Sequence, residues 1–276
     1  MHNIYLSAIL ALISAATMAA GTVWRHRIMR AGASPLRSMR RPAWWASMGV
    51  AFLAYGFQAA ALAFGSLLVV QPVLALSLML TLLFSARQEH RRMHPEEAFW
   101  GALLTISVAG VVLLGRPLAG TREPLAWEWV IVVISAVAVV AGAFAFAYRR
   151  PTATQSLTYG ISCGALFGYQ ALFSKVAVDD FVTGGIMGLL TSWQLWAMLL
   201  AATAGTIVQQ YAFAAGNLGT SLPAAKVVEP IVAFTLGIFL LGETFRVTSG
   251  AGWAATGASI SIMLISAAML TRASVR

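Results

Sequence analysis

The sequence predicts an all-α, polytopic membrane protein built as one bundle of about nine transmembrane helices. Two properties of its composition point there. Of the 276 residues, 59% are hydrophobic and only 10% are charged, and the mean hydropathy is +0.80. Soluble domains carry roughly 25% charged residues. A chain of this length therefore has too few charged side chains to cover a water-exposed surface, and lipid is the solvent that fits it.

The spacing of the apolar runs is the third observation. A helix needs about 20 apolar residues to cross the hydrocarbon of a bilayer. The first run is followed, not preceded, by arginines such as Arg25 and Arg27. A signal peptide has the opposite order, so we expect a true first helix. The predicted spans are residues 4–24, 43–64, 67–86, 96–115, 127–148, 157–178, 189–215, 220–241 and 247–271.

The formal net charge of +9 does not indicate nucleic-acid binding, because the basic residues form short groups between spans. Such grouping is typical of membrane topology. With the N-terminus outside, the predicted cytoplasmic segments hold 13 of the 18 Lys and Arg residues. The outer loops then hold Arg116, Arg122, Lys175 and Arg246, and Lys226 alone falls within a span. This bias predicts a plasma (inner) membrane protein with its N-terminus outside and its C-terminus in the cytoplasm.

Metal and cofactor chemistry find little support in the sequence. Cys163 is the only cysteine, so an intrachain disulfide is impossible and a cysteine-based metal site is not expected. His90 and His94 flank two arginines in a basic loop, where solvated histidines are the ordinary case. No motif of a hydrolase, a phosphate-binding loop or a dinucleotide fold is present. We expect a protein that is not an enzyme and uses no cofactor.

Two stretches of the chain resemble each other, residues 58–85 and residues 210–243. Their anchors are Gln58 with Gln210, Gln71-Pro72 with Glu229-Pro230, and Ser85 with Glu243. The pairing predicts an inverted four-plus-four repeat, because a single unpaired span reverses the sense of the second copy. Many carriers build two alternating states from such repeats. The expected parts are repeat one at about 1–118, a connector helix at about 119–150, and repeat two at about 151–276.

Over nearly its whole length the chain resembles the drug/metabolite transporter superfamily in its EamA-like form. The resemblance rests on VVEPIVAFTLGIFLLGE (227–243), on Gln209-Gln210 before AFAAG, and on CGALFGYQALFSKVA (163–177). The nine-helix layout is most similar to the actinobacterial branch and shares its outline with NIPA-type magnesium transporters. The first repeat departs from the pattern, since Ser85 and Gln71 stand where the second has Glu243 and Glu229. The resemblance implies secondary transport and does not specify a substrate.

The segment SLPAAKVVEP (221–230) contains the strongest candidate site. A charged side chain at the centre of a membrane helix costs roughly 2.5–3.5 kcal/mol on insertion scales, and Lys226 and Glu229 lie three residues apart on one face. Pro223 and Pro230 bracket the pair and free backbone carbonyls. We predict that Glu229 binds substrate or a proton and that Lys226 is its counter-ion. The alternative is an ion pair that only fixes helix packing.

Further candidates are polar side chains expected at membrane depth, which either bridge helices or line a cavity. Gln58 and Gln210 are favoured because they are equivalent in the repeat. Glu243 is expected to form an interfacial pair with Arg246 rather than an ion site. The stripe Gly160, Gly164 and Gly168 predicts close helix approach within the fold, with a homodimer as the alternative. The remaining candidates are Gln71, Gln209, Tyr169, Gln170 and the helix-breaking Pro72.

Three functions remain open at this stage. The first is secondary-active transport of a small metabolite or drug by alternating access in the lipid bilayer, with proton coupling through Glu229. The second is flipping of a lipid or lipid-linked sugar, since basic loops attract anionic headgroups. The third is divalent-cation (magnesium) transport, although hard cations need several oxygen ligands and the spans offer one clear carboxylate.

Overall fold

The structure is a computed structural model that describes residues 3–30, 42–90, 92–215 and 218–274. Part of the predicted basic segments, namely Arg37, Arg40, Arg41, Arg91 and Arg276, lies outside the described residues. The elements follow in the order α1 (Ile4–Arg30), α3 (Pro42–Phe64), α4 (Leu67–Gln88), α5 (Pro95–Gly115), β1 (Pro117–Leu118), α6 (Ala126–Ala147), α7 (Thr152–Thr191), α8 (Trp193–Ala214), α9 (Leu218–Phe239), β2 (Thr244–Phe245) and α10 (Gly250–Ala273).

The protein is a multi-pass membrane protein with an all-α bundle, as the composition predicts. Within the described residues, nine helices are long and apolar enough to cross a membrane. Their outer surfaces carry large apolar side chains, shown for α6 by Val130, Ile134 and Val137, each more than half exposed. Such a surface is unfavourable in water and stable against acyl chains.

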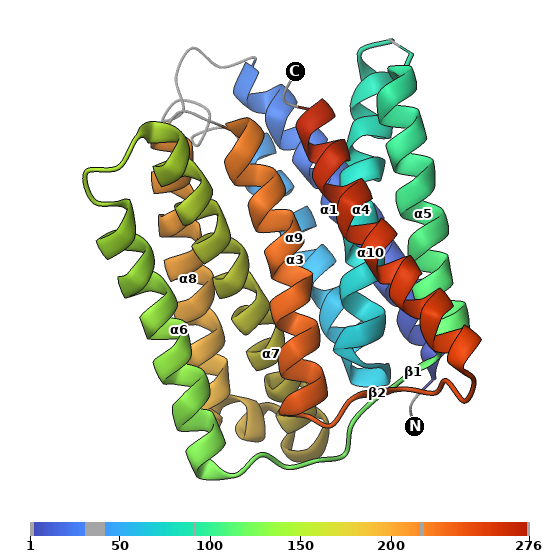
Figure 1. The fold of residues 1–276 in the computed structure, drawn as a ribbon, viewed down its shortest axis with the longest axis vertical. Helices are drawn as coiled ribbons and strands as arrows, with labels where there is room; N and C mark the ends of the chain where they lie inside the picture. Colours follow the sequence, from blue (N-terminus) through green and yellow to red (C-terminus); the bar gives the residue numbers. More distant parts are fainter. Residues whose placement is uncertain (1–2, 31–41, 91, 216–217, 275–276) are drawn as a thin grey trace.

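The helices are arranged as two halves of opposite direction. α1 packs against α3 and α4, and α7 packs in the same way against α8 and α9. α1 starts at the end of the bundle that carries the N-terminus, whereas α7 starts at the opposite end (Figure 1). α5 packs on α10 and α4 on α9, which joins the halves. We call the two ends of the bundle the N-terminal face and the C-terminal face.

Helix α7 differs from its predicted span of 157–178. It runs over Thr152–Thr191 as two helical stretches joined at Gly185, whose φ of +61° suits a residue without a Cβ. The hydroxyl of Ser192 donates to Asp180 Oδ2 at 2.6 Å and ties the second stretch back to the first. Lys175 lies well inside this helix and not in a loop, so its predicted place in an outer loop is wrong.

A short two-stranded sheet closes part of the N-terminal face. β1 and β2 pair antiparallel, with Pro117 opposite Phe245 and Leu118 opposite Thr244. Close by, Arg122 donates to the carbonyl of Phe239, at the C-terminal end of α9, and forms an ion pair with Glu128 at the start of α6. A cation at a helix C-terminus and an anion at a helix N-terminus both complement the helix dipole. These contacts connect α5, α6, α9 and α10 at one face (Figure 1).

Candidate functional site

The Lys226–Glu229 pair forms as the spacing predicts. Both residues lie on α9, whose interior contains Pro223 and Pro230. The Nζ atom of Lys226 donates to Glu229 Oε2 at 3.0 Å. Each proline lacks a backbone N–H, so the backbone around the pair is less completely hydrogen-bonded than in a regular helix.

Neither charge of this pair is sealed inside the protein. The side chain of Lys226 is 39% exposed and that of Glu229 is 24% exposed, although both lie in a candidate membrane span. Charged groups within the membrane face a water-filled space or the bundle interior rather than acyl chains. The pair therefore lies in a span without being fully enclosed by the protein.

The other helices near the pair come from both halves. Cys163 of α7 and Tyr55 of α3 are close enough to Lys226 to interact with it electrostatically. Cys163 is buried, whereas Tyr55 is half exposed. The pair therefore lies where α9 faces its partner α7 and a helix of the first half.

The glycine stripe of α7 packs directly against the backbone of α9. A Cβ added to Gly160 would lie 2.5 Å from the carbonyl oxygen of Ser221, and one added to Gly168 would lie 2.7 Å from Val232 Cβ. At Gly164 an added Cβ would clash with the backbone of Ala225. The predicted role of the stripe within the fold is confirmed. It brings α7 against the helix turns that carry Lys226 and Glu229.

Substitution of Gly164 by alanine should destabilise the protein by about 1–3 kcal/mol, because one methyl group must push α7 away from α9. The matched control is Gly142→Ala on α6, where an added Cβ meets no atom within 4 Å. We expect the melting temperature in detergent to fall for Gly164→Ala and to stay at the wild-type value for Gly142→Ala. Equal melting temperatures for the two variants would contradict the close packing.

The other predicted site residues are spread over several helices. Gln58 on α3 and Gln71 on α4 are buried, and Pro72 lies inside α4. Tyr169 is also buried, with its hydroxyl 2.8 Å from Ser135 Oγ of α6. Gln170 and Gln209 are half-buried, and Gln210 is exposed. Gln58 and Gln210 are thus in different surroundings and do not share one buried cluster.

Glu243 has a role that the sequence analysis missed. Its side chain is fully buried, at 0% exposure, and it accepts hydrogen bonds from the backbone N–H groups of Leu67 at 2.8 Å and Leu68 at 3.1 Å. These are the first residues of α4, so Glu243 caps that helix from the other half of the chain. The predicted interfacial pair with Arg246 is wrong, because the carboxylate points into the bundle.

Lys175 makes the complementary contact to the end of α3. It is only 3% exposed, and its Nζ atom donates to the carbonyl of Leu62 at 2.8 Å and to Asp179 Oδ1 at 2.9 Å. A cation thus binds the C-terminal end of α3 and an anion binds the N-terminal end of α4, as the helix dipoles favour. Two charged residues of the second half of the chain hold the α3–α4 connection of the first half.

Glu243 lies outside the membrane spans, and burial raises its pKa to about 7. The hydrogen bonds from Leu67 and Leu68 and the charge of Lys175 act in the opposite direction, while Asp179 raises the pKa further. The loss of hydration thus outweighs the capping contacts, and the carboxyl group exchanges its proton near neutral pH.

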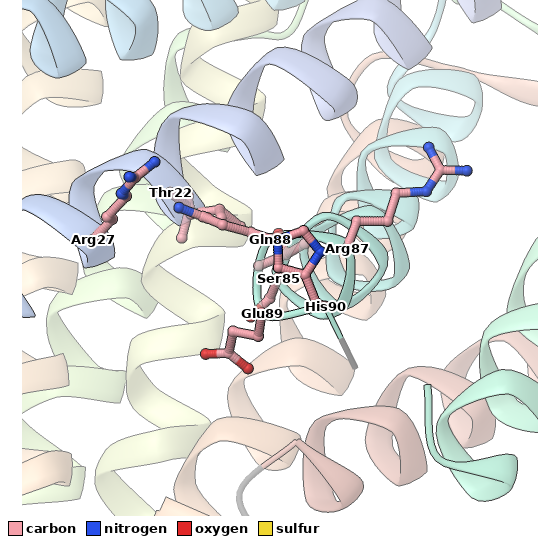
Figure 2. A pocket seen from close by; sticks show the side chains of 9 residues that line it. Thr22, Arg27, Ser85, Arg87, Gln88, Glu89 and His90 are labelled. Atoms are coloured by element: carbon pink, nitrogen blue, oxygen red, sulfur yellow. The ribbon is translucent and has the colours of Figure 1, made fainter. Parts of the chain in front are cut away.

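Two cavities are found away from these charges. One of about 600 Å³ opens at the C-terminal face between α1 and α4 (Figure 2). A second of about 250 Å³ lies between α1, α4 and α10. Neither is lined by Lys226 or Glu229. In the part of the chain that the structure describes, no group of three or more His, Cys, Asp or Glu residues could hold a metal ion.

Comparison with known proteins gives one informative relative. An uncharacterized protein of Corynebacterium glutamicum is 46% identical over 282 residues, which cover 99% of this chain and 97% of that protein. The chain belongs to the family of that protein. No family model matches the chain, and no solved structure matches it. Because the alignment within this family spans almost the whole chain, it includes α7, α9 and the residues that hold the α3–α4 connection.

Proposed function

We propose that the protein is a secondary-active transporter that moves a small polar metabolite or drug across the plasma membrane by alternating access. In this proposal Glu229 binds the substrate or a coupling proton, and Lys226 is the counter-ion that keeps the site neutral when it is empty. The N-terminus lies outside and the C-terminus in the cytoplasm, on the strength of the arginine distribution.

The single observation that carries the proposal is the partly exposed Lys226–Glu229 pair on the proline-containing helix α9. An exposed ion pair contributes only about 0–1 kcal/mol to stability, so packing alone gives little reason to keep two charges in a membrane span. A binding site, by contrast, must remain accessible. The opposite directions of the two halves support alternating access around such a site, and the EamA-like sequence resemblance agrees with this function.

The test is ligand-induced thermal stabilisation of the purified protein. The panel contains amino acids, nucleosides, cationic drugs, Mg²⁺ and polyprenyl-phosphate lipids. A ligand that binds only the folded state at 100 times its Kd stabilises by about 2.7 kcal/mol. We expect a soluble organic ligand to raise the melting temperature of the wild type, and we expect Glu229→Gln to abolish that shift.

Two variants complete the design. Glu123→Gln changes an exposed loop carboxylate and should leave the shift unchanged. The double variant Lys226→Gln with Glu229→Gln leaves no unpaired charge in the span, so we expect it to fold. If it folds and shows no ligand-induced shift, the loss is due to binding and not to misfolding. A shift that persists in both α9 variants would remove the pair from the substrate site. A response to Mg²⁺ alone or to lipids alone would replace the proposed substrate class.

A further inference from the structure

The two cavities lie next to each other and share part of their lining. Thr22 of α1 and Thr81 of α4 line both of them. The larger cavity reaches the C-terminal face at Arg27 and Arg87, and the smaller one extends inward to Ser77 of α4 and Leu270 of α10. We call this the α1–α4–α10 groove. It is separate from the Lys226–Glu229 pair.

The mouth of the groove is positively charged. Arg27 comes from α1 and Arg87 from α4, while His90 and Glu89 complete the titratable lining. In Figure 2 the two arginines lie on either side of Gln88, and the carboxylate of Glu89 points away from both guanidinium groups. With histidine neutral, two positive charges and one negative charge leave the mouth with a net positive charge. It therefore suits an anion, and a single guanidinium group can donate two hydrogen bonds to a phosphate.

Beyond the mouth the groove is less polar than its composition suggests. Three of its hydroxyl groups donate to carbonyls of their own helices, Thr22 to Met18 at 2.8 Å, Thr81 to Ser77 at 2.6 Å and Thr271 to Ala267 at 2.6 Å. Their protons are therefore used within the helices. The lining also includes the apolar side chains of Met18, Leu78 and Leu82. Such walls favour a hydrocarbon chain over a polar solute.

The length of the groove matches one leaflet of a bilayer. Eleven residues separate Ser77 from Gln88 on α4, which corresponds to about 16 Å at 1.5 Å per residue. Half of a hydrocarbon core of about 30 Å is about 15 Å. The charged mouth at the membrane face matches the headgroup of an anionic phospholipid. The cleft behind it, about one leaflet deep, matches the length of its acyl chain.

From this geometry we infer that the α1–α4–α10 groove binds an anionic phospholipid, with the headgroup at the mouth that Arg27 and Arg87 line and an acyl chain along α4. This inference goes beyond the proposed transport function, since the groove shares no lining residue with the Lys226–Glu229 site. A bound lipid would fill the space between α1, α4 and α10.

Native mass spectrometry of the detergent-solubilised protein tests the inference. The probes are dioleoyl phosphatidylglycerol, dioleoyl phosphatidylcholine and glycerol phosphate. Loss of a charge-assisted hydrogen bond weakens binding by about tenfold or more. We expect phosphatidylglycerol to bind at least about tenfold more tightly than phosphatidylcholine, and we expect the double variant Arg27→Gln with Arg87→Gln to lose this preference.

Three further variants make the result specific. Arg150→Gln removes an arginine that lies over the ring of Phe146 outside the groove, and it should keep the preference, as should Glu229→Gln. Thr22→Trp places an indole where the two cavities meet, at an exposed position, and should reduce binding of both lipids. Equal binding of the two lipids, or an equal loss in Arg150→Gln, would overturn the inference. Glycerol phosphate bound as tightly as the intact lipid would show a soluble phosphate site instead.

Discussion

Replacing Glu243 by alanine is expected to lower the free energy of unfolding by about 3 kcal/mol, which makes it the most damaging substitution that we predict. The variant removes the acceptor for the N–H groups of Leu67 and Leu68. Leaving buried donors without partners costs about 1–3 kcal/mol each, and truncating a fully buried side chain adds a cavity. Chemical unfolding of the protein in detergent at pH 6 would measure the loss. At this pH, below its pKa of about 7, Glu243 is mostly protonated. The substitution therefore does not also remove a buried negative charge, which would be stabilising and would offset the loss.

Nothing local replaces this cap. Ser66 is the N-cap residue of α4, but its side chain makes no capping hydrogen bond, and its hydroxyl is buried without a partner among the described residues. Glu243 therefore stands in for a cap that the adjacent sequence does not supply. Glu123→Ala, in an exposed loop, should change the unfolding free energy by less than about 0.5 kcal/mol. A similarly small effect of Glu243→Ala would show that water caps α4 instead.

The sequence was sufficient to predict the features that depend on short-range patterns. Apolar runs of membrane length predicted the helices, since each span satisfies its own backbone hydrogen bonds. Lys226 and Glu229 are three residues apart, so helix geometry alone places them on one face. The glycines at 160, 164 and 168 recur every four residues, and this spacing predicted a surface for close helix packing, which α9 fills.

The features that the sequence did not predict depend on partners far along the chain. Lys175 was predicted to lie in an outer loop. In the structure its charge is satisfied by Asp179 and by the carbonyl of Leu62, 113 residues away. Glu243 looked interfacial because Arg246 is near in sequence, while its partner Leu67 is 176 residues away. No local pattern encodes contacts of this kind, which arise only once the two halves of the bundle pack together.

Lys175 and Glu243 also connect the two halves of the bundle at the N-terminal face. Lys175 belongs to α7 and Glu243 follows α9, and both bind the connection between α3 and α4. If the halves move against each other during transport, these contacts must break or move with them. Burial raises the pKa of Glu243 to about 7, so the strength of the connection should depend on pH.

The stability of the protein should accordingly decrease between pH 4.5 and pH 7 through Glu243. The pKa of this carboxyl is about 7 in the folded protein, against an ordinary value of 4.5. In this window the folded state holds a proton that the unfolded state has released, and stability therefore falls as the pH rises. A pKa shift of this size corresponds to about 3 kcal/mol of unfolding free energy. This contribution is present below pH 4.5 and is lost by about pH 7.

The measurement is the difference in unfolding free energy between wild type and Glu243→Gln at several pH values. A glutamine cannot titrate, and the other carboxylates contribute equally to the pH dependence of both proteins. The charged groups facing Glu243 are Lys175 and Asp179 of α7, with Arg122 packed against the neighbouring Gly242. We expect the wild type to lose stability relative to the variant as the pH rises. The opposite slope would mean that the N–H groups of α4 and the charge of Lys175 stabilise the carboxylate more than burial destabilises it. Glu243 would then be a permanently charged cap rather than a group that binds and releases protons.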